Sequence, residues 1–150
     1  MRHSVFADPE CYPAVSLHQP YAGLVRLELK PIETRKTRIH YRGPLVICAT
    51  QSIDGDAYLR LFRELVPGRV SGDAFQAACE IRGALCALVE VVGCRELTPE
   101  DEPRSLFYAE GRFAWELERI RPLKPLPVRG SQGFFRVPRA LVDGALGGGA

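Results

Sequence analysis

A lysine, a glutamate and an arginine lie close together in residues 30–35, which read KPIETR. Side chains alternate between the two faces of a strand, so a strand after Pro31 places Glu33 and Arg35 on the same face. The chain turns at Pro31, which lets Lys30 fold back towards Glu33, and we predict an ion pair between them. An amine and a carboxylate at this spacing can act as acid and base. Lys30 and Glu33 are therefore the candidate catalytic residues.

The exposure of this pair decides what its loss would do. On a cleft wall open to water, an ion pair contributes only about 0–1 kcal/mol to stability. Replacing Glu33 by glutamine is then expected to impair ligand binding or turnover and to leave the melting temperature nearly unchanged. The alternative is a purely structural pairing of Glu33 with Lys30 or Arg35, whose loss lowers stability and leaves binding intact.

A second group of polar residues comes just before this run. A short apolar strand over residues 14–17 ends at His18 and Gln19, and Pro20 is suited to the first turn of a helix. The N-terminus of a helix offers unpaired N–H groups and the positive end of a dipole, which suit an anion. We predict that His18, Gln19 and Tyr21 contribute to a ligand site. The alternative for Tyr21 is a core anchor of that helix.

Further candidates for ligand binding lie at three other places in the chain. Thr50 and Ser52 end an apolar strand over residues 45–50, and Arg38 belongs to an acid-free basic run over residues 35–42. Residues 119–139 hold six basic residues and no acid, and could join the first run in one positive surface; the alternative is solvated loops. Within them lies the late loop, residues 129–133, whose candidate residues are Arg129, Gly130, Ser131 and Gln132.

The remaining pattern predicts the elements that position these residues. Apolar residues at helical spacing follow Ser52 and Asp54, either of which can cap a helix, and Ser71 can cap a shorter one. Thr98 opens a short helix that Pro103 limits. Strands are predicted over residues 83–92, 112–120 and 134–137. Strands outnumber helices, so we predict an α+β fold, a mixed β-barrel of about five to six strands with flanking helices.

Several of these segments resemble the motifs of the ASCH domain, a member of the PUA-like superfamily. Residues 16–22, SLHQPYA, are similar to the family's S-(I/L)-x-Q-P-(W/Y)-A, and residues 30–35 to its K-x-x-E-x-R. RGPL with the later AT, FAWEL and VRGSQGF match further motifs in the family's order. The resemblance covers roughly residues 14–138. The family usually has a glycine before the lysine, where this chain has Leu29.

The resemblance implies a PUA-like barrel whose motif segments line one cleft, where relatives hold a nucleic-acid backbone or an extruded base. It implies binding of RNA in preference to DNA, or of a modified nucleoside. Small bacterial ASCH proteins hydrolyse the amide of N4-acetylcytidine with a Lys, a Thr and a Glu. Lys30 matches that lysine, whereas Glu33 stands where the threonine is expected. Hydrolysis of a nucleoside amide or of RNA is the alternative to binding alone.

Composition sets the wider limits. The length suits one domain, and we predict a flexible N-terminal arm over residues 1–13, the domain over 14–143 and a flexible Gly-rich tail over 144–150. The five cysteines form no C-x-x-C pair. We predict that Cys48, Cys86 and Cys94 are buried thiols, and we expect no metal, no cofactor and a reducing cytoplasm. Nothing approaches the ~20 apolar residues of a membrane span. We expect a monomer.

Overall fold

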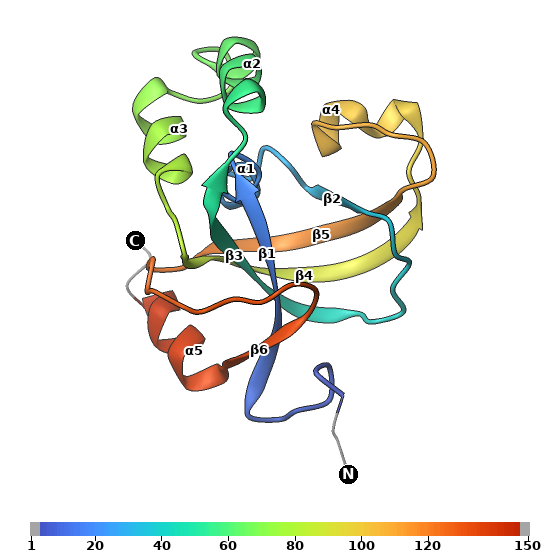
Figure 1. Ribbon diagram of the computed structural model, residues 1–150, viewed down its shortest axis with the longest axis vertical. Helices are drawn as coiled ribbons and strands as arrows, with labels where there is room; N and C mark the ends of the chain where they lie inside the picture. Colours follow the sequence, from blue (N-terminus) through green and yellow to red (C-terminus); the bar gives the residue numbers. More distant parts are fainter. Residues whose placement is uncertain (1–3, 148–150) are drawn as a thin grey trace.

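A computed structural model describes residues 4–147 and contains one six-stranded mixed sheet with helices around it (Figure 1). In chain order the strands are β1 (Cys11–Gln19), β2 (Ile32–Arg35), β3 (Gly43–Ile53), β4 (Ala84–Glu96), β5 (Phe113–Pro122) and β6 (Phe135–Pro138). Their order across the sheet is β2-β5-β4-β3-β1-β6. β1 and β3 run parallel, and every other neighbouring pair is antiparallel. The chain between β1 and β3, which contains a helix and β2, thus returns to the same end of the sheet.

The central strands are buried on both faces because nearly every side chain is apolar. In β3, Leu45 and Ile47 pack into one core cluster, whereas Val46 and Cys48 pack into a second cluster on the other face. This alternation follows the two-residue period of a strand. The sheet therefore has apolar cores on both sides.

The helices lie at the ends and edges of the sheet. They are α1 (Tyr21–Arg26), α2 (Gly55–Leu65), α3 (Gly72–Cys79), α4 (Glu102–Ser105) and α5 (Arg139–Gly147), with a 3-10 turn, η1 (Pro99–Asp101), before α4. The Asp54 carboxylate accepts the Ala57 N–H at 3.0 Å and the Ser71 hydroxyl accepts the Ala74 N–H at 3.1 Å. Asp54 is thus the cap of α2, and the predicted cap of α3 is confirmed.

The predicted α+β class, with six strands and flanking helices, is confirmed. The sheet curls strongly but does not close, because its end strands β2 and β6 do not pair with each other in the described part of the chain. Trp115 on β5 is buried at 2% exposure and donates its indole N–H to the Thr37 carbonyl at 3.1 Å. It belongs to the core inside the curl.

The expected boundary of the N-terminal arm is wrong at residues 11–13, which are already part of β1. Tyr12 pairs with Val137 of β6, is buried at 8% exposure, and donates its hydroxyl to Asp143 at 2.8 Å. Before the strand lies the N-terminal segment, residues 4–10, and Asp8 in it forms an ion pair with Arg136 at 3.4 Å. Residues 1–3 lie outside the described part. Burial of the Tyr12 ring explains the earlier start of the strand.

The expected Gly-rich tail is likewise wrong at residues 144–147, which belong to α5. Ala145 is fully buried beside Val142 in the second core cluster, and its carbonyl accepts the Lys124 N–H at 3.0 Å. Glycine is a poor helix former, which is why the sequence did not predict this helix. Packing against the sheet offsets that low propensity. Residues 148–150 lie outside the described part.

Candidate functional site

A buried ionic network joins the three charged residues of the 30–35 run. Glu33 is 3.5 Å from the Lys30 ammonium through Oε1 and 2.9 Å from Arg35 Nε through Oε2. The predicted proximity of Lys30 and Glu33 is confirmed. Both are buried, however, with side-chain exposures of 2% and 8%. The expectation that this ion pair is exposed and contributes little to stability is therefore wrong.

The Lys30 ammonium is held by the backbone as well as by Glu33. It donates to the Ile32 carbonyl at 2.7 Å and to the Ser105 carbonyl at 2.6 Å. The Glu33 carboxylate is its third partner, as an ion pair at 3.5 Å. Burial lowers the pKa of Lys30 below its ordinary value, and the negative charge of Glu33 offsets part of that effect. In this arrangement the Lys30 ammonium faces Glu33 and two backbone carbonyls.

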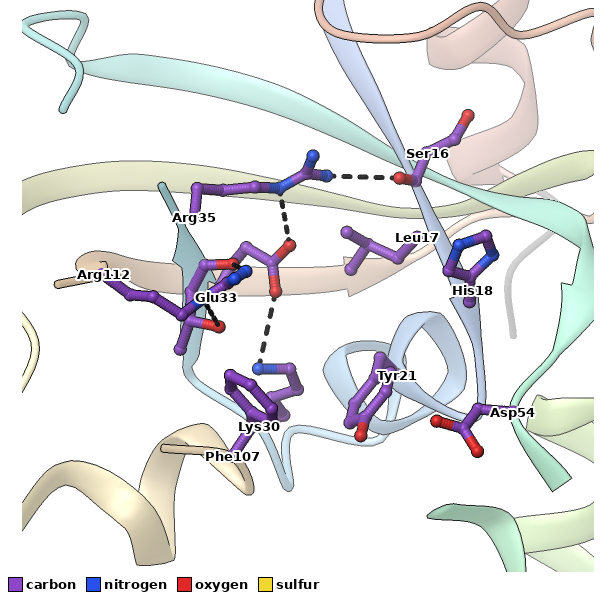
Figure 2. A pocket seen from close by; sticks show the side chains of 11 residues that line it. Ser16, Leu17, His18, Tyr21, Lys30, Glu33, Arg35, Asp54, Phe107 and Arg112 are labelled. Atoms are coloured by element: carbon purple, nitrogen blue, oxygen red, sulfur yellow. Dashed lines mark hydrogen bonds and ion pairs between the residues drawn. The ribbon is translucent and has the colours of Figure 1, made fainter. Parts of the chain in front are cut away.

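Glu33 and Arg35 face a pocket of about 310 Å³, the first pocket (Figure 2). Its lining residues are Ser16, Leu17, His18, Tyr21, Lys30, Glu33, Thr34, Arg35, Asp54, Phe107 and Arg112. Figure 2 shows Glu33 between Lys30 and Arg35, with His18 and Asp54 across the pocket from them. The volume is at the lower end of the ~300–1,000 Å³ range of small-ligand sites.

A larger pocket of about 700 Å³, the second pocket, adjoins the first. Its lining residues are Ser16, His18, Arg35, Cys48, Ala49, Thr50, Gln51, Gly83, Val128, Arg129, Gly130, Ser131, Gln132 and Gly133. Ser16, His18 and Arg35 line both pockets and are called the shared wall. The two pockets thus form one divided cleft between the end of β1, β2 and the late loop.

The shared wall is ordered by hydrogen bonds from several elements. Arg35 Nη2 donates to the Ser16 carbonyl at 3.2 Å. The exposed His18 ring has Nδ1 3.1 Å from the Thr50 hydroxyl, which also accepts the Ser52 N–H at 3.0 Å. These contacts fix the end of β1 between β2 and β3, so polar groups of three strands meet in one place.

The predicted ligand-binding residues other than Gln19 divide into two classes by their place in the structure. Seven line the cleft: His18, Tyr21, Arg35, Thr50, Arg129, Ser131 and Gln132, as does the backbone at Gly130. Arg38 and Ser52 line neither pocket. The Arg38 guanidinium lies 4.8 Å from the ring centroid of Phe113. Ser52 contributes its backbone to the Thr50 contacts.

Gln19 is structural, which corrects the expectation that it binds a ligand. It is fully buried. Its amide donates to the Ala78 carbonyl at 3.0 Å and the Ile81 carbonyl at 2.8 Å, and it accepts the Gly23 N–H at 2.9 Å. These bonds join the end of β1 to α1 and to the chain around α3. The Gln19 side-chain oxygen thus accepts an N–H of α1, at the helix N-terminus where an anion was expected.

Sequence reasoning missed several residues of the cleft, among them Ser16, Asp54, Phe107 and Arg112. Ser16 lies in the quoted motif but contributes a carbonyl and a hydroxyl to the shared wall, and Asp54 was considered only as a helix cap. Arg112 donates to the Thr34 carbonyl at 2.9 Å and lies 5.1 Å from the Phe107 ring. Phe107 and Arg112 are far from Glu33 in sequence. The pairing of β2 with β5 brings Arg112 near Glu33, and the bond from Lys30 to the Ser105 carbonyl brings the chain before Phe107 near it.

The cysteines and the ionisable residues of the described chain show no metal centre. Cys48 and Cys86 are buried as predicted, whereas Cys94 is only partly buried. Burial raises the pKa of both buried thiols to about 12, so they remain protonated near neutral pH. Among residues 4–147, no group of three or more His, Cys, Asp or Glu side chains is arranged to hold a metal ion. Within the same residues, no helix is long and apolar enough to cross a bilayer.

The curled mixed sheet with a polar cleft beside β1 and β2 defines a PUA-like fold. The chain belongs to the ASCH domain family, whose sequence model matches residues 15–127. The ordered motifs of the sequence had indicated this family, and the prediction is confirmed. No curated protein matches the sequence.

Solved structures of an ASCH protein from Zymomonas mobilis have a similar fold. The parent protein aligns over 88% of this chain and 91% of its own at 10% identity, with a TM-score of 0.52. A serine-to-alanine variant of it aligns over 93% and 96% at 11% identity, with a TM-score of 0.55. A tyrosine-to-phenylalanine variant aligns over 89% and 94%, with a TM-score of 0.52. At this identity the likeness concerns the fold alone.

Proposed function

We propose that this ASCH domain binds single-stranded nucleic acid, RNA in preference to DNA, with a base in the first pocket and phosphates along the second. The observation that carries the proposal is the shared wall. Arg35 is paired with Glu33 on one side and lines the late-loop pocket on the other. One extended ligand can therefore contact the Glu33 carboxylate and the Arg35 guanidinium at the same point. A nucleotide suits both, because its base has N–H donors for the carboxylate and its phosphate is an anion for the guanidinium.

The second pocket suits a phosphate backbone. Arg129, Ser131 and Gln132 are exposed on its rim. Cationic side chains and backbone N–H groups are the usual partners of phosphate oxygens. Arg35 uses Nε and Nη2 in its contacts with Glu33 and Ser16, which leaves Nη1 for an anion that reaches the shared wall.

The first pocket suits a base. Glu33 is an acceptor-only side chain held in place by Lys30 and Arg35, and it can accept an N–H of a Watson–Crick edge. Tyr21 and Phe107 add aromatic rings to the lining, and unpaired bases commonly stack on such rings. A base that enters this pocket loses its water. Bases whose N–H groups can donate to the Glu33 carboxylate are therefore favoured over those that cannot.

The preference for RNA rests on the ribose and on the family. The Thr50 hydroxyl and the His18 ring face each other at 3.1 Å beside the shared wall. Both can donate or accept, as a 2′-hydroxyl does. ASCH domains are associated with RNA binding or hydrolase activity, which supports the same choice.

A salt-dependent titration tests this function. Fluorescence anisotropy with a labelled single-stranded RNA of mixed sequence is expected to give binding that weakens steeply as salt rises, because phosphate contacts release counterions. The matching DNA is expected to bind more weakly. Absence of binding to both strands at low salt would overturn the proposal, as would an affinity that is indifferent to salt.

Hydrolysis is the second candidate, and the buried Lys30 is the observation that favours it. Its lowered pKa means that the neutral amine, which can take a proton, forms at a lower pH than in an ordinary lysine. The amine would have to leave the Ile32 or Ser105 carbonyl to reach a substrate. Thr34, next to the position where the family's threonine is expected, lines the first pocket, and its hydroxyl accepts the Arg112 Nε–H at 3.3 Å.

Incubation with N4-acetylcytidine and with labelled RNA separates the two candidates. Turnover by the parent protein that is lost in folded Lys30→Met would support hydrolysis with Lys30 as acid or base. Binding of RNA without turnover of either compound would leave the chain a binding domain.

A further inference from the structure

A continuous stack of rings connects the shared wall to the N-terminal segment. The Arg35 guanidinium lies 5.6 Å from the ring centroid of Trp115. Trp115 stacks on Phe134 at 5.5 Å with an interplanar angle of 9°. Phe134 meets the ring of Phe6 edge-on at 4.7 Å, and Phe6 stacks on Tyr41 at 4.6 Å. Separations of about 4.5–7 Å are those of favourable aromatic pairs.

Phe6 is central to the attachment of the N-terminal segment. Strand pairing of this part of the chain begins only at Cys11. Before that point, the ring of Phe6 lies between Tyr41 and Phe134, and Asp8 pairs with Arg136 at 3.4 Å. Phe6 is itself only partly buried. In addition, the Glu10 carbonyl accepts the Arg139 N–H at 2.9 Å. A segment held by few contacts can dock and detach at modest cost in free energy.

Phe134 connects this docking to the cleft. It directly follows Gly133, the last residue of the late loop that lines the second pocket, and precedes β6. Its other face is against Trp115, which lies under the Arg35 guanidinium. A ring held between Phe6 and Trp115 fixes the end of the late loop and also supports the guanidinium of the shared wall.

We propose that Phe6 is a positioning residue for the nucleic-acid site and that docking of the N-terminal segment preorganises Arg35 and the late loop for binding. This inference rests on the proposed function. A loop that is already ordered loses less conformational entropy when a ligand binds. Because coupling between two binding events is reciprocal, bound nucleic acid also strengthens the docking of the N-terminal segment.

The single tryptophan of the chain makes the stack observable, since Trp115 is its only fluorescent indole. In Phe6→Ala we expect an altered Trp115 emission. We also expect affinity for the labelled single-stranded RNA to fall about 3- to 10-fold, within the range of coupling carried by packed side chains. Phe6→Tyr keeps the ring and is expected to restore both. Phe62→Ala is the matched control, because Phe62 is a partly buried ring that packs on Phe75, away from the stack.

Hydrogen exchange on the parent protein provides a second test that does not depend on a variant. RNA is expected to slow amide exchange in the N-terminal segment, as the reciprocal coupling requires. If the parent binds RNA and Phe6→Ala binds equally well, or exchange in residues 4–10 does not respond to RNA, this inference is wrong and the proposed function stands. If the parent binds no nucleic acid, both are wrong.

Discussion

The two pockets of the cleft share a wall but are built in opposite ways. In the first pocket the functional carboxylate is almost buried, and Lys30 and Arg35 hold it from both sides. In the second, Arg129, Ser131 and Gln132 are exposed on a loop between β5 and β6. A ligand entering the first pocket meets a carboxylate held by buried partners, whereas one entering the second meets exposed side chains of a loop.

The difference separates the energetic roles of the two regions. Buried, fully bonded polar groups cannot lose one partner without leaving another unsatisfied. Exposed loop residues have water as an alternative partner and contribute little to folding. Substitutions in the first pocket and behind it should therefore change stability, and substitutions in the second should change binding alone.

Gln19 should give the largest stability change, although it touches no ligand. In Gln19→Leu, the Ala78 and Ile81 carbonyls and the Gly23 N–H lose their partner. Buried groups without partners cost about 1–3 kcal/mol each, so we expect a loss of about 3–5 kcal/mol in chemical denaturation. Gln132→Leu, in the exposed loop, should change stability by no more than about 0.5 kcal/mol. If Gln19→Leu and Gln132→Leu changed stability equally, the two regions would not differ in the way described.

Loss of the Glu33 carboxylate should give the second-largest change in stability. In Glu33→Ala the Lys30 ammonium keeps its two carbonyl partners but loses its counter-charge, and breaking such a buried pair costs about 3 kcal/mol. Thermal and chemical denaturation measure this. The matched control is Glu64→Ala, because Glu64 pairs with Arg60 at 3.9 Å on the exposed face of α2. Its loss should cost no more than about 0.5 kcal/mol. A Glu33 variant as stable as the control would contradict the buried network.

The contribution of Asp101, a buried carboxylate behind the first pocket, should depend on pH. Its carboxylate binds both Nη atoms of Arg95 at 2.8 Å and anchors the turn before Ser105 and Phe107. These hydrogen bonds to Arg95 hold the pKa of Asp101 well below its ordinary value of 3.8. The stability it supplies is complete above that ordinary value and is lost as pH falls through the lower, folded-state pKa.

Denaturation of Asp101→Asn and of the parent at several pH values measures this contribution. The two should differ most near neutral pH, by about 1–3 kcal/mol, and the gap should narrow as the solution is acidified below pH 3.8. A gap that stayed constant across that range would contradict the role of the ionised carboxylate.

Arg129 should have the smallest effect on stability and a clear effect on binding. Arg129→Ala is expected to weaken binding of all single-stranded sequences alike and to lower the salt slope by about 1, as loss of one phosphate contact requires. Its stability should stay within about 0.5 kcal/mol of the parent. Arg38→Ala is the control, since Arg38 lies against Phe113 and lines neither pocket. If Arg38→Ala has the larger effect, the ligand follows another surface.

Local patterns predicted much of the fold and the core of the site. Alternation and helical spacing located the strands and α2, and the turn at Pro31 was enough to predict that Lys30 approaches Glu33. These features depend on residues close together in sequence. Ser71 was found in the same way, from its position just before a helix.

The rest depends on partners that are distant in sequence. Lys30 is buried because the Ser105 carbonyl lies over it, and Gln19 is structural because the chain around α3 returns to the end of β1. No local pattern distinguishes a glutamine that binds two distant carbonyls from one that binds a base. Likewise, Phe6 gains its place from Tyr41 and Phe134, and a polar N-terminal stretch contains no sign of that contact.

An NMR titration of the isotope-labelled protein with a short single-stranded RNA tests the central claim most directly, because it observes both pockets at once. We expect the amide signals of Glu33 and Arg35 and those of Gly130, Ser131 and Gln132 to shift together, with one dissociation constant. Signals around Arg38 should remain in place. Shifts confined to one pocket, two unrelated dissociation constants, or changes only outside the cleft would contradict a single nucleic-acid site across the shared wall.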